Sequence, residues 1–510
     1  MRSRILAPAL AAVAGLIAAG TLLAVSELAA LPLAGAASPL LAAGSFVVDI
    51  VPRPLKEFAI TTFGTADKPV LLASLGVAAG VAAALIGILA RHTLRWALVL
   101  LGAVGLVVTV LVVTRAGAGP LDAIPTALGT IAAAIVLAVL IRRLRPREGS
   151  TTEQGVDRRG FFLIAGAAAA GAVIVGVGAR ALSSVLTSVR AAREALRIPS
   201  PRTTVTVPAG AEFDIPGLTP LFTSNADFYR VDTALSVPEI DPGTWRLRID
   251  GLVDRTIELD LDDLFSMGLD EYAITLTCVS NEVGGNLVGN ATWLGVPVRD
   301  VLRMAGPQSG ADMLLSRSVD GYTASTPLSA VTDDGIDAIL AVAMNGEPLP
   351  LEHGFPVRMV VPGLYGYVSA TKWLTGLTVT TFADDEAYWT PRGYSARAPM
   401  KFSSRVDTPK IGSPVPAGTV PIAGVAWAQT VGIERVEVQI DDGPWQHARL
   451  SQAVNNDTWV QWMLPWEATP GTHYLTVRAV NRDGEMQIEE PAPIAPNGSS
   501  GWQRTLVTVR

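Results

Sequence analysis

The sequence is poor in the two residue types that most often bind transition metals. It contains a single cysteine, Cys278, so no disulfide can form within the chain. It contains four histidines, which excludes the usual metal centres built from several histidines. A lone cysteine is either an unreactive, buried small side chain or a reactive thiol or metal ligand, and composition alone leaves both interpretations open.

Charged residues are also scarce. They make up 17% of the chain, the net charge is −7, and no basic stripe is present, so we expect no nucleic-acid partner. Hydrophobic residues make up 49% and are concentrated in the first third of the chain. The length leaves room for about three domains.

Long uncharged stretches dominate the N-terminal third. Five of them approach the roughly 20 apolar residues that a membrane-spanning helix needs. They are Ile5–Val25, Val70–Ala90, Trp96–Val113, Ile124–Ile141 and Phe161–Gly178. We therefore predict an N-terminal bundle of about five transmembrane helices embedded in the lipid bilayer.

Basic residues are unevenly distributed around these stretches. They precede the first stretch, separate the second from the third, and are densest between Arg142 and Arg159, which separate the fourth from the fifth. Loops rich in arginine and lysine remain in the cytoplasm. We therefore expect the protein to lie in the cell membrane with its N-terminus on the cytoplasmic side. An odd number of spans then places the rest of the chain on the extracytoplasmic side.

An arginine pair, Arg158 and Arg159, precedes the fifth stretch and is followed by Gly-Phe-Phe-Leu and an Ala/Gly-rich apolar run. This pattern over residues 157–180 resembles a twin-arginine export signal placed inside the chain. The alternative is that the two arginines only anchor the cytoplasmic end of a helix.

The membrane half contains few groups that could do chemistry. A haem between helices generally needs two axial ligands, often histidines, and only His92 lies near the spans. The spans contain no charged residue that would mark an ion path, which disfavours a transporter. We interpret this half as an anchor or docking platform.

The composition changes twice beyond the membrane half. A basic connector and several prolines predict a linker over 183–204, after a membrane anchor over 1–182. Short β-rich runs with a few helical pieces predict an α+β domain over 205–402. Regularly spaced strands then predict an all-β, immunoglobulin-like sandwich over 403–510.

Several blocks in the second half occur in the order found in a known family. They are Thr275–Asn281, Trp293–Leu302, Met344–Arg358, Val361–Gly366 and Lys372–Leu374. With these blocks, the region 205–510 resembles the sulfite oxidase superfamily of molybdopterin-dependent oxidoreductases. The resemblance implies that superfamily's catalytic fold, a molybdenum-molybdopterin cofactor, a small-molecule substrate and a C-terminal dimerisation domain, which makes a homodimer an expectation.

The resemblance also implies roles for individual residues. Cys278 matches the molybdenum ligand, and a soft thiolate suits a metal already bound by the dithiolene sulfurs of the pterin. His353 and Arg358 match positions that hold the pterin and its phosphate. Tyr394 matches a tyrosine near the metal, where a phenol can donate a hydrogen bond or a proton, so it joins Cys278 as a catalytic candidate. The other implied cofactor-binding residues are Asn225, Phe228, Tyr229, Asp320, Ser369, Ala370, Thr371 and Lys372.

The sequence departs from sulfite oxidases where those enzymes place arginines around their anionic substrate. It has Ser224, Glu282 and the pair Val431–Gly432 at the corresponding places. Permanently charged, bidentate donors are well suited to an oxyanion, so their loss disfavours sulfite. We therefore expect two-electron oxygen-atom transfer with a neutral oxo substrate such as a sulfoxide.

Two alternatives remain open at this point. One is a sulfite dehydrogenase of the sulfite oxidase type, and the other is a non-catalytic exported binding protein with the same fold. The sequence shows no haem or flavin domain, so we expect a separate electron-transfer partner.

Overall fold

The computed structural model describes most of the chain as two compact units. The described residues are 2–30, 38–51, 67–115, 118–144, 189–410 and 414–510, with a few isolated positions in between. The first unit comprises residues 1–188 with 234–237, and the second comprises 189–233 with 238–510.

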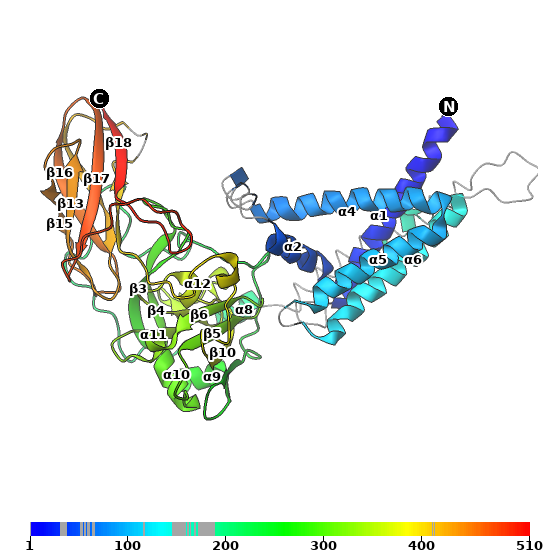
Figure 1. Ribbon diagram of the computed structural model, residues 1–510, viewed down its shortest axis with the longest axis horizontal. Helices are drawn as coiled ribbons and strands as arrows, with labels where there is room; N and C mark the ends of the chain where they lie inside the picture. Colours follow the sequence, from blue (N-terminus) through cyan, green and yellow to red (C-terminus); the bar gives the residue numbers. More distant parts are fainter. Residues whose placement is uncertain are drawn as a thin grey trace, which may run out of the picture. The chain divides into compact units, whose positions relative to one another are not determined.

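The first unit consists of apolar helices, shown in blue and cyan in Figure 1. They are α1 (Arg2–Ala30), α2 (Pro39–Ile50), α4 (Asp67–His92), α5 (Leu94–Val113), the short 3-10 turn η3 (Pro120–Asp122) and α6 (Ala123–Leu144). Within the described part of the chain, four stretches are long and apolar enough to cross a membrane, and they match the first four predicted spans: Ala7–Ala30, Lys68–His92, Leu94–Val113 and Pro120–Leu144.

The fifth predicted span, Phe161–Gly178, lies mostly outside the described residues, as do Arg158 and Arg159. The short apolar helix α2 was not expected from the sequence, because its 12 residues are too few to span a bilayer.

Glycines allow α1 and α4 to approach each other closely. A Cβ atom on Gly15 would lie 1.9 Å from the carbonyl oxygen of Ala83, and one on Gly87 would lie 2.1 Å from that of Ala11. Neither position has room for a side chain. Such contacts are typical of helices that associate inside a bilayer.

The second unit begins with helix α8 (Val189–Ala195) and continues into two sheets. The first sheet has the order β2-β1-β10-β5-β6, with bounds Ile257–Leu259, Leu247–Gly251, Leu374–Thr380, Met313–Ser318 and Thr323–Pro327. The second has the order β3-β4-β7-β8, with β9 also paired to β7; its strands are Asp270–Thr277, Val288–Pro297, Ile339–Met344, Glu347–Pro348 and Arg358–Val360.

These two sheets share one hydrophobic core. Leu247, Leu377 and Leu314 of the first sheet belong to the same buried cluster as Leu340 and Met359 of the second. Helices α9 (Leu261–Ser266), α10 (Val298–Ala305) and α11 (Leu328–Thr332) add apolar residues to this cluster. The mixed sheets and short helices agree with the α+β architecture predicted from the sequence.

The C-terminal strands form two four-stranded antiparallel sheets, drawn in orange and red in Figure 1. One is β11-β12-β16-β15 (Ser403–Thr408, Gly418–Trp427, Val460–Ala468, Arg449–Leu450) and the other is β14-β13-β17-β18 (Gln446–His447, Ile433–Ile440, Gly471–Asn481, Gln503–Val509). Residues of both sheets, including Trp462 and Val436, form one buried cluster. The region is therefore β-rich and two-layered.

Candidate functional site

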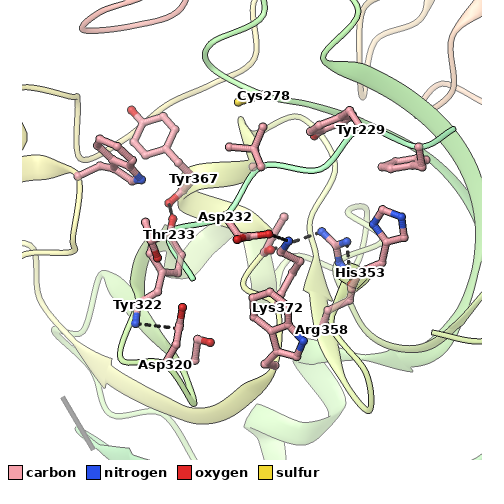
Figure 2. A pocket seen from close by; sticks show the side chains of 17 residues that line it. Tyr229, Asp232, Thr233, Cys278, Asp320, Tyr322, His353, Arg358, Tyr367 and Lys372 are labelled. Carbon is pink, nitrogen blue, oxygen red and sulfur yellow. Dashed lines mark hydrogen bonds and ion pairs between the residues drawn. The ribbon is translucent and has the colours of Figure 1, made fainter. Parts of the chain in front are cut away.

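A pocket of about 790 Å³, including its opening to solvent, lies in the second unit. This volume suits a large cofactor or substrate. Its lining comes from many separate segments: Phe228, Tyr229, Val231, Asp232, Thr233, Cys278, Ser318, Asp320, Tyr322, His353, Arg358, Gly366, Tyr367, Ala370, Lys372, Trp373 and Trp389. Figure 2 shows Tyr322 and Tyr367 to one side of this space, Tyr229, His353 and Arg358 to the other, and Cys278 at one end.

Cys278 is placed by the end of a buried strand. It directly follows β3, whose alternating apolar and β-branched residues form an edge strand of the second sheet. The Cys278 backbone N–H donates to the carbonyl oxygen of Leu287 at 2.9 Å, and Ser280 N–H donates to its Sγ at 3.4 Å. Burial raises the pKa of the thiol, so a cation would be needed to hold it as a thiolate.

His353 belongs to the short 3-10 turn η4 (Leu351–His353) and is nearly fully buried. Its Nε2 lies 3.0 Å from the carbonyl oxygen of Asn225, and its ring makes an edge contact with Phe228. Burial and the nearby Arg358 lower its pKa to about 4. The imidazole is therefore neutral at pH 7 and can donate one hydrogen bond.

Arg358 begins β9 and is buried beneath the pocket. Its two Nη atoms donate to the carbonyl oxygens of His353 (3.1 Å) and Ala370 (3.4 Å), and its guanidinium lies 5.0 Å from the ring centre of Trp293. Burial lowers its pKa to about 10. Its Nε has no hydrogen-bond partner among the described residues, an expensive state for a buried charged donor.

Lys372 reaches the same end of the pocket. Its Nζ donates to Asp232 Oδ2 at 2.8 Å and to the carbonyl oxygen of Glu352 at 3.0 Å. Burial lowers its pKa to about 8, against the opposing effect of Asp232. Asp232 is the carboxylate that balances this lysine, and Arg230 also donates to it.

The basic end of the pocket fits a phosphorylated cofactor. His353, Arg358 and Lys372 come together there, and the unpaired Nε of Arg358 faces no protein acceptor within the described part of the chain. The buried hydroxyl of Ser318, another lining residue, is likewise without a partner there. A bound anion with several acceptor oxygens could accept hydrogen bonds from the Arg358 Nε–H and from the Ser318 hydroxyl.

The segment with the expected cofactor-binding residues Asn225, Phe228 and Tyr229 lies beside this basic end. Phe228 and Tyr229 line the pocket and stack at 5.3 Å between ring centres. Asn225 does not line the pocket. Its side-chain amide donates to Glu347 Oε1 at 2.7 Å, and its backbone carbonyl oxygen lies 3.0 Å from His353 Nε2. Asn225 thus holds His353 in place rather than facing the cavity.

The expected segment 369–372 contributes alternate residues. Ala370 and Lys372 line the pocket. The hydroxyl of Ser369 donates instead to the carbonyl oxygen of Tyr365 at 3.0 Å, and that of Thr371 lies 2.7 Å from the hydroxyl of Ser316. These two side chains are buried and shape the backbone of helix α12 (Gly366–Ser369) and its exit.

Aromatic residues form the opposite wall. Tyr322, Tyr367 and Trp389 line it; the Tyr322 hydroxyl donates to the carbonyl oxygen of Tyr367, and the Tyr367 hydroxyl donates to that of Ser395, both at 2.7 Å. Burial, with a contribution from Cys278, raises the pKa of Tyr322, so its phenol stays protonated. Asp320, at the edge of this wall, accepts from the backbone of Tyr322.

Tyr394 lies behind the aromatic wall. Its ring contacts Tyr367 at 5.6 Å and Trp389 at 5.2 Å between centres, but it is not among the lining residues. Trp389 and Tyr322 themselves were not proposed from the sequence, although each lies within five residues of a proposed site residue, Tyr394 and Asp320 respectively.

The positions expected to replace the arginines of sulfite oxidases contribute no charge to the pocket. Ser224 is exposed and its hydroxyl donates to Asp227 Oδ2, while Glu282 is exposed in the turn after Cys278. Neither these residues nor Val431 and Gly432 line the cavity. Among the described residues that line the pocket, His353, Arg358 and Lys372 are the ones with basic side chains.

Comparison with known proteins gives consistent matches. Residues 234–389 match the model of the oxidoreductase molybdopterin binding domain. Human mitochondrial sulfite oxidase is 31% identical over 328 residues, covering 54% of this chain and 59% of the human protein. Chicken (Gallus gallus) sulfite oxidase is 30% identical over 350 residues, covering 58% of this chain and 75% of the chicken protein.

The fold agrees with these matches. The sulfane dehydrogenase SoxCD from Paracoccus pantotrophus superposes with a TM-score of 0.50 at 23% identity, covering 57% of this chain and 82% of that one. The matched part spans 59% of the length of the human protein, so the match does not extend over that whole enzyme. The chain belongs to the sulfite oxidase family of molybdopterin-dependent oxidoreductases.

Proposed function

We propose that this protein catalyses two-electron oxygen-atom transfer on a neutral oxo substrate, for example a sulfoxide. The supporting observation is the distribution of charge in the pocket. Its basic side chains lie at one end, and the aromatic wall, with the protonated phenol of Tyr322, lies at the other. The basic end has the chemistry of a cofactor-phosphate site, which leaves the aromatic end for substrate.

The proposed cofactor site uses Cys278 as the molybdenum ligand. Arg358, Lys372 and His353 would hold the phosphate and pterin, with Phe228 and Tyr229 against the pterin. Asp320 and the backbone of 369–372 would complete the site, and Asn225 would contribute by holding His353 in place. The bound cofactor supplies the two-electron redox chemistry, and the protein supplies anchoring, orientation and a water-poor pocket.

The aromatic wall favours an uncharged substrate. The lining phenol of Tyr322 stays protonated, and the nearest lining carboxylate, Asp320, would repel an anion. Tyr394 remains a proposed catalytic residue; its ring packs against Tyr367 and Trp389 behind the residues that line the pocket. Sulfite dehydrogenase is the second candidate, because the curated relatives named above are sulfite oxidases.

A paired assay separates the two candidates. With purified, molybdenum-loaded protein, we expect sulfoxide reduction with an artificial electron donor to exceed sulfite oxidation with an artificial acceptor by at least about tenfold in kcat/KM. Each absent charged contact to sulfite is worth about 1.5–3 kcal/mol. The Cys278→Ser protein is the negative control for both reactions. A clear preference for sulfite would establish the second candidate instead, and a protein that takes up no molybdenum when expressed with the cofactor would favour a binding role.

We propose the following organisation for the whole chain. Residues 1–182 would form a multi-pass anchor with a cytoplasmic N-terminus, and 183–204 a linker to an extracytoplasmic catalytic domain over 205–402. Residues 403–510 would form an immunoglobulin-like dimerisation domain. The apolar helices support membrane anchoring, and the charge bias supports the orientation. A separate carrier would exchange electrons with the catalytic domain.

We further propose that export depends on Arg158 and Arg159 as a twin-arginine signal. A domain that folds around a cytoplasmic cofactor must cross the membrane folded. Changing both residues to lysine keeps the charge, so a purely electrostatic anchor predicts unchanged topology. We expect instead that the C-terminal domain stays inside, protected from protease added to intact spheroplasts. Full cleavage from outside, with molybdenum still bound, would contradict the signal.

A further inference from the structure

Strand β3 leads directly to Cys278, and only one of its edges is paired within its sheet. That edge forms an antiparallel ladder with β4, in which Thr275 lies opposite Asn290. The other edge would leave backbone groups unpaired, and they are buried, since Thr275 is fully inaccessible to solvent. The partners of this second edge therefore determine how firmly the cysteine is held.

The C-terminal domain supplies these partners. The N–H of Thr275 donates to the carbonyl oxygen of Asp457 at 2.9 Å, and the side-chain amide of Asn455 donates to the carbonyl oxygen of Ala273 at 2.9 Å. The N–H of Trp459 donates to the hydroxyl of Thr275, also at 2.9 Å. A turn in the last domain thus completes the edge of the strand that carries Cys278.

Gln429 makes the remaining contacts and joins three segments. Its Nε2 donates to the carbonyl oxygen of Thr275 and, at 2.6 Å, to that of Asp457. Its Oε1 accepts from the backbone N–H of Gly363 at 2.9 Å. Both amide protons and the carbonyl oxygen of this one side chain are used.

Gly363 connects Gln429 to the cofactor-binding segments. It follows β9, which begins with Arg358, and precedes α12, after which come Ala370 and Lys372. Gly363 has a φ of +77°, a conformation that favours glycine. A Cβ atom there would lie 3.2 Å from Thr430 Cγ2, so the turn at residues 428–432 packs closely against the backbone of Gly363. The Gln429 amide therefore bridges two segments of the second sheet that approach the pocket separately, the end of β3 and the chain that follows β9.

We propose that Gln429 is a positioning residue for the metal site, which fixes Cys278 relative to the Arg358 and Lys372 segment from the neighbouring domain. Thr275 is three residues before Cys278, and the side chain of Gln429 hydrogen-bonds to the backbone of both Thr275 and Gly363. The proposal rests on family membership and cofactor binding, and it is independent of which substrate is turned over.

The chemistry of the contact calls for an amide. A glutamate of the same shape could still accept from Gly363, but it would place a carboxylate oxygen against the carbonyl oxygens of Thr275 and Asp457. Loss of two donors and the resulting repulsion should loosen the end of β3. The change Gln429→Glu therefore removes the bridge with little change in volume.

The single cysteine provides a direct readout. In full-length protein prepared without cofactor, alkylation of the buried Cys278 requires local opening of this region, so its rate at fixed pH reports on the strand end. We expect Gln429→Glu to raise the rate about tenfold, the factor for about 1.4 kcal/mol of lost hydrogen bonding. The matched control, Gln446→Glu at an exposed position in β14 of the same domain, should leave it unchanged.

A second variant and a second readout complete the test. Asn455→Asp removes the donor to Ala273, two residues farther from Cys278 than Thr275, and should raise the labelling rate less. In cofactor-loaded Gln429→Glu we expect a shifted thiolate-to-metal absorption and a lower kcat with unchanged KM. If Gln429→Glu does not fold, Gln429→Met decides, because it removes the same donors without adding a charge. Labelling rates and absorption equal to those of the unmodified protein in the folded variant would overturn the proposal, whatever the substrate assay shows.

Discussion

Replacing Cys278 with serine is expected to abolish turnover while leaving the fold intact. The side chain is buried at one end of the pocket, and an oxygen of similar size is a poor substitute for a soft thiolate on this metal. Even the loss of a group outside a metal's direct ligands lowers activity or metal affinity about 10–100-fold, so loss of a ligand should exceed that.

Three measurements on the Cys278→Ser protein check this expectation. They are turnover per bound molybdenum, the thiolate-to-metal absorption and the thermal unfolding temperature. We expect the first two to disappear and the third to stay close to that of the unmodified protein. Normal turnover per metal atom would show that the thiol has no part in the site.

Arg358→Ala is expected to yield folded protein with little molybdopterin. The guanidinium is buried at the basic end of the pocket, with one donor unpaired in the described structure. A hydrogen bond to a charged group contributes about 1.5–3 kcal/mol, so each one lost weakens cofactor retention by about 10- to 100-fold. Pterin and metal content of the purified protein measure the effect.

Controls separate cofactor binding from general damage. Arg317→Ala changes an exposed arginine of β5 and should leave cofactor content unchanged. Arg358→Lys keeps a charge but lacks the second Nη group that contacts Ala370, so it should retain part of the cofactor. Full occupancy in Arg358→Ala would remove this residue from the proposed site.

Local sequence patterns predicted much of the architecture. Short β-rich runs with a few helical pieces predicted an α+β domain, and regularly spaced strands predicted the β-rich region after residue 403, where β11 to β18 lie. Four uncharged stretches became helices of spanning length. These features depend on residues that are close together in the sequence, so their pattern can be recognised in a single sequence.

The sequence revealed less about the composition of the pocket. Cys278, His353, Arg358 and Lys372 were named through family motifs, and they do line one cavity. Asp232 had no such motif, because its role depends on a contact with Lys372, 140 residues away. The same holds for the aromatic wall and for Gln429, whose contacts join segments remote in the chain.

X-ray absorption at the molybdenum edge tests the central claim, that Cys278 anchors the cofactor in this pocket. The number of sulfur neighbours around the metal is measured in the purified protein and in Cys278→Ser protein that still holds metal. The account predicts one sulfur fewer in the variant, because the dithiolene sulfurs stay and the thiolate is lost. An equal number of sulfur neighbours in the two proteins would contradict it.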